Sequence, residues 1–362
     1  RGEAMGAKVS KEDKEAVAEA RRTKKLRASG RSLQALPAVY AKVPAVEELW
    51  LQENELEEVP REMLEKWGEG VELFYCYQNK FKSIPEGTRA LASLEEFNIS
   101  ANPEIAELPE ELPPCWPKLK QIYMNDLPLL TSVPGSIGHW KALKVLHLNN
   151  CALAGLPEEI GELSSLTMVS MNNNKIQHLP SGVASWTKVE KLFMNDNELT
   201  QLPPELSQMA ALEKCYFSNN QITALPEEMF DGPLADILDE LYLVDNQLTT
   251  LPESLAQCKK LGKLYIDNNR VAIIPSSIDA LSGLEIFHAN NNEIEEVPES
   301  LGRMSGMKFL HLAHNSITHL PSSLTDLREL RAFEVDEGNE LSDEAKAVVT
   351  QVTESLVPAW TF

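Results

Sequence analysis

One dipeptide recurs in phase along almost the whole chain: a Leu, Val or Ile followed by Pro. Eight of the twelve intervals between successive prolines are 23 residues, and none exceeds 26. So regular a period predicts a stack of short structural repeats rather than the two or three separate domains that 362 residues would otherwise suggest. The prolines in phase are Pro37, Pro60, Pro85, Pro109, Pro134, Pro157, Pro180, Pro203, Pro226, Pro252, Pro275, Pro298 and Pro321.

Each unit follows the pattern L-x-x-L-x-L-x-x-N-x-L-x-x-L-P. One unit shows it at Leu166, Val169, Met171, Asn174, Ile176, Leu179 and Pro180. Strand side chains alternate between two faces, so the L-x-L core buries two apolar residues and turns the residue between them outward. One strand per unit predicts a parallel sheet, and the segment after Pro predicts a short amphipathic return. A single unit cannot bury its apolar face alone, so neighbours must stack.

An Asn follows each strand at a fixed distance. Its amide can bond turn backbone that the next unit would otherwise bury unpaired, which predicts a ladder of buried amides. The ladder positions are Asn54, Asn79, Asn102, Asn174, Asn197, Asn220, Asn246, Asn269, Asn292 and Asn315, with Cys151 in the same slot.

Residues 23 to 341 resemble the leucine-rich repeat family on these motifs. The 23-residue period with L-P-x-x-I/L, as at Leu225 to Met229 and Leu320 to Leu324, is similar to the intracellular Ras-group and Ras-suppressor type. The resemblance implies an α/β solenoid, a curved horseshoe with a parallel concave sheet and short convex helical or 3-10 segments. It also implies a scaffold for protein partners, often in small-GTPase or phosphatase signalling.

Both ends of the chain predict helical caps, which an open stack needs to cover its terminal apolar faces. Ser10 with Asp13 forms a capping-box pattern, and Ser342 precedes a second amphipathic stretch. The expected organisation is an N-terminal cap with a first partial repeat at 1–36, a solenoid at 37–335 and a C-terminal capping helix at 336–362.

Three places depart from the pattern. An extra residue follows the ladder position at Asn102-Pro103 and Leu127-Pro128, which leaves the local turn geometry open. The unit from Pro226 to Pro252 is longer by three residues, and its Asp-Gly-Pro at 231–233 predicts a turn inserted on the convex side.

The composition excludes some classes of binding partner and indicates the cellular compartment. With 55 Asp and Glu against 33 Lys and Arg, the net charge is −22, so the body of the protein repels nucleic acid and anionic lipid. No stretch approaches the ~18 apolar residues of a membrane span. Five cysteines without a preceding apolar leader favour a reducing, cytoplasmic compartment. Cys76 and Cys215 are expected in the core.

The outward column between the two strand leucines is the candidate partner-binding surface. Although aromatic residues make up 6% of the chain, seven of the thirteen column positions are aromatic, and five of the seven tyrosines fall there. Exposed aromatic patches are where protein partners dock. The alternative is ordinary β-propensity with ring packing across strands. The column reads Trp50, Tyr75, Asn98, Tyr123, His147, Ser170, Phe193, Tyr216, Tyr242, Tyr265, His288, His311 and Glu334.

A polar column and a row of lysines flank these rings. Such polar groups orient a partner around an apolar anchor, and the lysines are expected to meet carboxylates or carbonyls of that partner. A solvated rim that binds nothing is the alternative. The polar column is Asn125, Asn149, Asn172, Asn195, Ser218, Asp267 and Asn290, and the lysines are Lys191, Lys214 and Lys263.

Near the C-terminal end, His288, His311 and Glu334 follow one another in the outward column. A metal-binding or enzymatic site there is a second hypothesis, although nothing forces these side chains to converge on one ion. With His314 nearby, we instead expect stacked histidines that charge near pH 6–7. The sequence lacks the common nucleotide-binding, zinc-protease and hydrolase motifs, so we predict no enzyme and no cofactor.

The expected function is therefore a non-enzymatic scaffold or adaptor, and a structural subunit of a larger assembly is the alternative. One further motif concerns the N-terminus, where Met5-Gly6 opens the M-G-x-x-x-S form of an N-myristoylation signal. Residues 1–31 carry ten Lys and Arg against five Asp and Glu, which is the usual second signal for weak membrane association. If Met5 is the natural start, acylation of Gly6 is expected.

Overall fold

The computed structural model describes residues 9–357. The chain divides into two compact units, residues up to Asn174 (unit 1) and residues from Lys175 (unit 2). The candidate lipidation site Gly6 lies outside the described residues. Between residues 9 and 357, no helix combines the length and the apolar character that a membrane crossing requires.

Unit 1 contains seven parallel strands of three residues, each hydrogen-bonded to the next in chain order. They are β1 (Lys25–Arg27), β2 (Glu48–Trp50), β3 (Leu73–Tyr75), β4 (Glu96–Asn98), β5 (Gln121–Tyr123), β6 (Val145–His147) and β7 (Met168–Ser170). Its helices are α1 (Lys11–Thr23) and α2 (Arg61–Trp67), and its 3-10 helices are η1 (Ala38–Lys42), η2 (Glu86–Ala90), η3 (Pro113–Cys115), η4 (Gly135–His139) and η5 (Glu158–Glu162).

Unit 2 repeats this arrangement, again with parallel strands that pair in chain order. Its strands are β8 (Lys191–Phe193), β9 (Lys214–Tyr216), β10 (Glu240–Tyr242), β11 (Lys263–Tyr265), β12 (Ile286–His288), β13 (Phe309–His311) and β14 (Ala332–Glu334). Its helical segments are η6 (Ser181–Ser185), η7 (Pro204–Gln208), η8 (Glu227–Phe230), η9 (Pro233–Asp236), η10 (Glu253–Gln257), η11 (Ser276–Ala280), η12 (Glu299–Arg303), η13 (Ser322–Asp326) and α3 (Asp343–Glu354).

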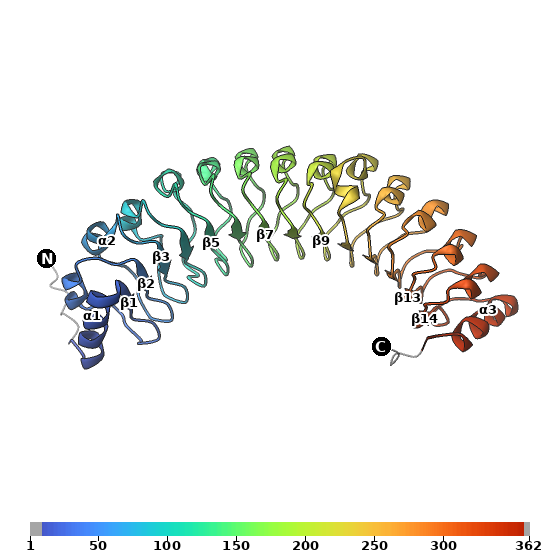
Figure 1. The fold of residues 1–362 in the computed structure, drawn as a ribbon, viewed down its shortest axis with the longest axis horizontal. Coiled ribbons are helices and arrows are strands. Elements are labelled where there is room, and N and C mark those ends of the chain that lie inside the picture. The colour runs from blue at the N-terminus through green and yellow to red at the C-terminus, as the bar shows by residue number, and fades with distance from the viewer. Residues whose placement is uncertain (1–8, 358–362) are drawn as a thin grey trace. The chain divides into compact units, whose positions relative to one another are not determined.

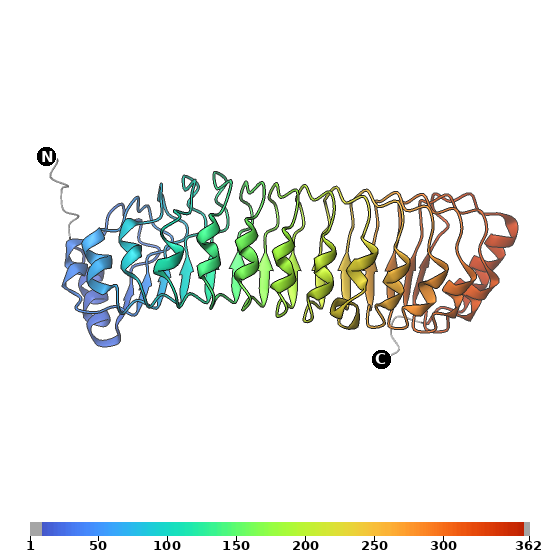
Figure 2. The same cartoon turned by 90° about the horizontal axis from the view of Figure 1, so that it is seen from above.

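The predicted solenoid of parallel strands and short outer helices is confirmed in each unit. Strands lie along one side of a unit and helical segments stand in a row along the other (Figures 1 and 2). The middle residue of nearly every strand is fully buried, while its neighbours in the same strand are half-exposed. Each return segment from Pro37 onward begins beside a proline, whose fixed φ suits the first residue of a helical turn.

The asparagine ladder is also confirmed. Asn246 is typical: its Nδ2 donates to the carbonyls of Phe217 (2.9 Å) and Leu243 (3.1 Å), and its Oδ1 accepts the N–H of Ile222 (3.0 Å). The same pattern recurs from Asn54 to Asn315 and continues at Asn339, which the sequence analysis did not include. Each amide therefore satisfies buried backbone in two repeats at once.

The irregular turns of unit 1 have a simple explanation. With Leu127 and Cys151 in ladder slots, no Asn amide reaches the two preceding turns. The extra Pro instead builds a local β-turn, in which the N–H of Ile105 donates to the carbonyl of Asn102 (3.1 Å) and that of Leu130 to Leu127 (3.0 Å). The long unit of unit 2 accommodates its insertion as predicted on the helical side, where 233–236 form the extra 3-10 helix η9.

A left-handed residue precedes the ladder position in each regular repeat, a feature that the sequence analysis did not predict. Asp196, Asn219, Asp245 and Asn268 have φ between 55° and 57°. Asn and Asp tolerate this region better than other non-glycine residues, which explains their frequency in this column. Ala101 adopts the same conformation, with φ 54°, without that advantage.

Both predicted caps are present. Ser10 and Asp13 form a complete capping box at the start of α1, and Ser342 accepts the N–H of Ala345 at the start of α3. β1 lies inside the predicted N-terminal segment 1–36, and the boundaries at 36 and 335 stay predictions. All five cysteines are free thiols, and Cys76 and Cys215 are buried in the core as expected.

Candidate functional site

Four aromatic rings form a continuous stack on the sheet face of unit 2, which we call the aromatic column: Phe193, Tyr216, Tyr242 and Tyr265. Strand register places the four residues directly beside one another. Successive ring centroids lie 4.7, 4.7 and 4.5 Å apart, and the interplanar angles are 7°, 18° and 8°. That spacing is close to the ~4.8 Å between neighbouring strands, so strand register sets the distance between the rings. Because the rings cover each other's faces, they present their edges to solvent.

Two imidazoles extend this column. His288 meets Tyr265 edge-on, with centroids 4.7 Å apart, and stacks on His311 at 4.0 Å. Burial, followed by the neighbouring His311, lowers the pKa of His288 to about 4. The expectation that it charges near pH 6–7 is therefore wrong for His288. His314 does not join the stack, because it lies in the turn after β13, with φ 52°. Its Nε2 lies 3.5 Å from the Glu337 carboxylate.

The carboxylates at this end contact the histidines one at a time. His311 Nδ1 lies 3.3 Å from Glu334 Oε2, and His288 Nδ1 lies 4.0 Å from Asp267 Oδ2. Between residues 9 and 357, no group of three His, Cys, Asp or Glu side chains is arranged to hold one metal ion. The metal hypothesis therefore finds no ligand set among the described residues.

A buried glutamate organises the lysine side of the aromatic column. Glu240, 5% exposed, occupies the same strand position as the lysines. Its Oε1 lies 2.7 Å from Lys214 Nζ and 3.1 Å from Lys263 Nζ, and its Oε2 accepts the hydroxyls of Tyr216 and Tyr242, each at 3.2 Å. Burial would raise the pKa of Glu240, but the two lysines outweigh it and lower that pKa to about 2.

This pairing changes the expected role of the lysines. We predicted that Lys214 and Lys263 would meet a partner's carboxylates, but Glu240 already supplies a carboxylate to both. Lys191, at the start of the row, has no ion pair among the described residues. Three apolar residues, Ile286, Phe309 and Ala332, continue the lysine row at β12 to β14. This apolar end was not predicted, although the strand period alone places it.

The polar column bonds the backbone of the next repeat. Oδ1 of Asn125 accepts the N–H of Asn149 (2.9 Å), Oδ1 of Asn195 accepts the N–H of Ser218 (2.8 Å), and Asp267 does the same for Asn290 (2.9 Å). Asn149 holds Asn172 in the same way, at 2.8 Å. One acceptor of these side chains is thus committed to the fold.

The sheet face of unit 1 carries its aromatic residues in isolated groups. Trp50 and Tyr75 meet edge-to-face at 4.6 Å, and the Arg27 guanidinium lies 5.6 Å from the centroid of the Trp50 ring. Tyr123 meets His147 edge-on at 5.0 Å.

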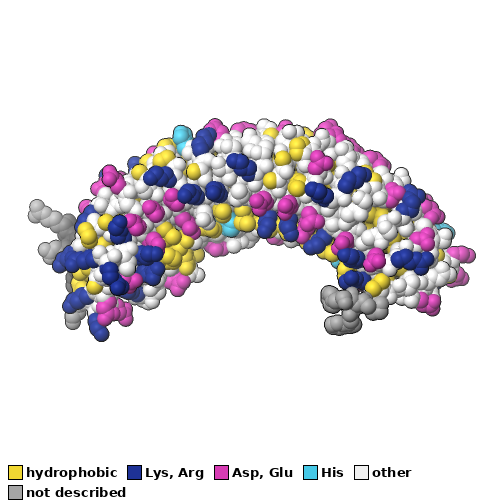
Figure 3. Space-filling view, viewed as in Figure 1, with side chains coloured by type: hydrophobic (Ala, Val, Ile, Leu, Met, Phe, Trp, Pro, Cys, Tyr) yellow, Lys and Arg dark blue, Asp and Glu magenta, His cyan; other side chains and the backbone are white. Residues whose placement is uncertain are grey.

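Charges on the surface in Figure 3 are interspersed, with acidic and basic side chains side by side.

Three comparisons bear on this architecture. Residues 212–271 match the family described as leucine rich repeat. Residues 212–271 are thus similar to leucine-rich repeats, and the repeats on either side of them share the same proline period. The disease resistance protein RPP5 of Arabidopsis thaliana is 32% identical over 76 residues, which cover 21% of this chain and 5% of that protein. The chain thus matches about one twentieth of this relative's length.

Solved structures agree with the fold. A leucine-rich repeat protein of Leptospira interrogans superimposes with a TM-score of 0.63 at 23% identity, covering 95% of this chain and 98% of the other. The plant peptide hormone receptor RGFR1 in complex with RGF2 gives 0.74 at 26% identity, covering 85% and 54%. The Toll–Spätzle complex of Drosophila gives 0.74 at 23%, covering 86% and 43%. Leucine-rich repeat proteins generally mediate protein–protein interaction, and the fold is typically a non-enzymatic binding scaffold.

Proposed function

We propose that the chain is a protein-interaction scaffold that binds its partner along the aromatic column on the sheet face of unit 2. The observation that carries this proposal is the half-exposed stack of Phe193, Tyr216, Tyr242 and Tyr265. A stack already ordered by the backbone loses little side-chain entropy on binding, and aromatic anchors dominate protein interfaces.

The chemistry of the surface suggests a partner that is largely uncharged where it meets the column. Glu240 pairs with two of the flanking lysines and offsets one of their two charges, and Ile286 and Phe309 add apolar area beside the imidazoles. The partner would place apolar side chains against the ring edges and hydrogen-bond donors against the hydroxyl oxygens of Tyr216 and Tyr242, whose own protons are donated to Glu240. The receptor and Toll structures contain protein or peptide ligands, which supports a protein partner here.

The test is a double substitution, Y216A/Y242A. It should cost about 2 kcal/mol or more of affinity per hot-spot residue while the repeat stack stays folded. Affinity capture with mass spectrometry, comparing wild type and variant, identifies proteins that depend on the column. Y75A/Y123A on unit 1 is the matched control. Equal capture by wild type and Y216A/Y242A would refute the assignment.

The setting of this function is also part of the proposal. The similarity of the 23-residue period to the Ras-group type suggests a small GTPase or a phosphatase as partner and a cytoplasmic location. Free thiols at Cys76, Cys215 and Cys258 are compatible with a reducing compartment. Acylation at Gly6 would add weak membrane association, and the mass of the natural N-terminal peptide tests it.

A further inference from the structure

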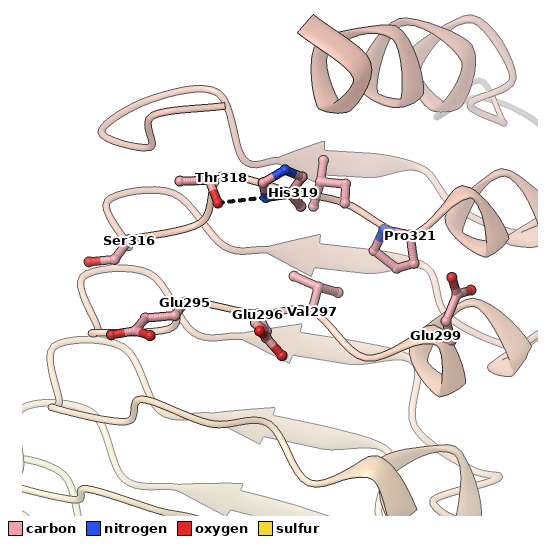
Figure 4. Close-up of a pocket in the computed structure, with 9 residues that line it drawn as sticks. Glu295, Glu296, Val297, Glu299, Ser316, Thr318, His319 and Pro321 are labelled. Carbon is pink, nitrogen blue, oxygen red and sulfur yellow. Dashed lines mark hydrogen bonds between the residues drawn. The ribbon is translucent and has the colours of Figure 1, made fainter. Parts of the chain in front are cut away.

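Two adjoining hollows form a groove on the flank of unit 2, between the ladder turns and the helices η11 to η13. Their volumes are about 630 and 720 Å³, and they share Glu295 and Glu296 in their lining. The floor of the groove is backbone in which Ile273, Glu296 and His319 of successive repeats are joined by parallel bridges. Figure 4 shows the end of the groove near Pro321.

The lining combines negative charge with one exposed apolar side chain. Glu253, Glu295, Glu296 and Glu299 line the groove, and no Lys or Arg does. Among the described residues, Glu295, Glu296 and Glu299 have no ion pair; we call these three the groove carboxylates. Ile273 is 66% exposed, although large apolar side chains are rarely so exposed in this chain. A surface of this kind suits a partner that offers a cation next to an apolar group.

Unit 1 has a hollow at the corresponding place, and it shows which group such a site accepts. This hollow, about 360 Å³, is lined by Glu86, which follows Pro85 as Glu299 follows Pro298. It also contains Arg89, whose guanidinium bonds the carboxylate of Glu111, while Arg61 lies 3.0 Å from Glu86. Unit 1 thus pairs two carboxylates of its hollow, Glu86 and Glu111, with its own guanidinium groups.

Unit 2 has no cation at the corresponding repeat position. Counted from the preceding proline, Gly302 takes the position of Arg89, and Ser323 takes that of Glu111. A Cβ at Gly302 would overlap the backbone of Ser323, so no side chain fits there. On the turn side, unit 1 pairs Lys82 with Glu57 (3.3 Å) at the repeat position of Glu295. Glu295 instead has Ala272 and Thr318 at that position of its two neighbouring repeats.

We propose that this groove binds an extended, arginine-bearing segment of a partner protein. A guanidinium would lie against the groove carboxylates, as Arg89 lies against Glu111, and an adjacent apolar side chain would cover Ile273. Ile273 and Glu296 are bridge partners, so the apolar and charged contacts are about one strand spacing, ~4.8 Å, apart. No described group of side chains is arranged to hold a metal, which favours an organic cation.

This surface is separate from the aromatic column, so it goes beyond the proposed function and fails or holds independently of it. A scaffold with two such surfaces in one unit can hold two partners, or two segments of one partner.

The probe is a fluorescein-labelled peptide, Gly-Arg-Leu-Arg-Ile-Arg-Gly, titrated by anisotropy at low salt. E295Q/E296Q/E299Q should bind it at least tenfold more weakly than wild type, and I273T about threefold more weakly. E69Q/E104Q/E329Q makes the same change of charge at exposed glutamates outside the groove, and it should stay within twofold of wild type. All substituted side chains are at the surface, and circular dichroism checks that each variant is folded.

Three results would overturn the proposal. If the control variant weakens binding as much as the groove variant does, the peptide responds only to the net charge of −22. If neither variant weakens binding, the peptide binds outside the groove. If sedimentation shows that wild type dimerises and the groove variant does not, the occupant is a second copy of this chain. A peptide with Ser in place of Leu and Ile should bind the wild-type protein about as weakly as the original peptide binds the I273T variant.

Discussion

The two units contain the same repeat but differ in its regularity, and the difference is clearest on their sheet faces. In unit 2 four rings occupy consecutive repeats and stack with interplanar angles of 18° or less. In unit 1, Asn98 and Ser170 interrupt the column, and rings that have one neighbour meet edge-on, as Trp50 and Tyr75 do at 90°. A parallel stack therefore requires an uninterrupted run of rings, in addition to strand register.

The ladder differs between the units in the same way. Unit 2 has an Asn in every ladder slot from Asn197 to Asn339, whereas unit 1 has Leu127 and Cys151 in two of its slots. Local turns replace the missing amides in unit 1. Regularity in unit 2 is thus maintained by side chains, and unit 1 partly replaces them with proline turns.

The largest expected effect comes from removing the ladder side chain in each unit. N246A removes the acceptor of the buried N–H of Ile222 and one of the two amide donors to each of the carbonyls of Phe217 and Leu243. It should therefore cost about 4 kcal/mol of unfolding free energy. C151A removes only weak thiol bonds, the shorter of them 3.3 Å from Met124 O, and should cost about 1 kcal/mol. Urea unfolding measures both. Equal losses would show that the two ladders are equally dependent on their side chains.

Next in size is the acid sensitivity that Glu240 gives to unit 2. Its pKa is about 2 in the folded protein, below its ordinary value of 4.5, so its contribution is complete above pH 4.5 and disappears as pH falls toward 2. The loss should approach roughly 3 kcal/mol. E240Q should flatten this part of the stability profile from pH 5 to pH 2. A profile unchanged by E240Q would mean that other carboxylates carry the acid response.

A smaller dependence at higher pH should come from His288. Its pKa, about 4, lies below the ordinary 6.5, so the unfolded chain binds the proton more readily and stability falls as pH drops from 6.5 to 4. The expected loss is roughly 2 kcal/mol, reduced from the full linkage value because the ring is partly exposed. H288F keeps a ring in the column and should remove this dependence. H319F, on the flank, is the control that should retain it.

The smallest contrast concerns the rings themselves. Y242L loses a ring neighbour on each side and should cost about 2 kcal/mol, whereas Y123L loses only the contact with His147 and should cost about 1 kcal/mol. The near-UV circular dichroism of the tyrosines should change more for Y242L. A larger spectral change for Y123L would contradict the importance of the uninterrupted run.

Most of the fold was predictable because the same sequence pattern recurs in each repeat. The proline period, the L-x-L core and the Asn positions predicted the parallel strands, the ladder and the outer helices, and the capping motifs at Ser10 and Ser342 predicted both caps. The strand Lys25–Arg27 precedes the first proline of the series, so the proline period did not predict this strand. The turns at Ile105 and Leu130 depend on which amides the following repeat lacks.

The candidate site was predictable in position but not in chemistry. Strand alternation placed Tyr216 and Tyr242 side by side. The pairing of Glu240 with two lysines depends on side-chain conformation across three repeats, and aligned repeat sequences do not show side-chain conformation. The depressed pKa of His288 depends on burial, and the groove at Glu296 depends on which residues two neighbouring repeats lack. Such properties arise from packing rather than from period.

Because the rings in unit 2 are equally spaced, the length of the aromatic column is set by the number of repeats that carry a ring. Inserting or deleting one complete 23-residue module between β8 and β11 would change the length of the aromatic column by one ring, in steps of ~4.8 Å. Since each ladder amide serves only its own and the preceding module, such a change leaves every remaining junction chemically alike. Gene duplication can therefore adjust the footprint of this face to a longer or shorter partner without redesigning a single contact.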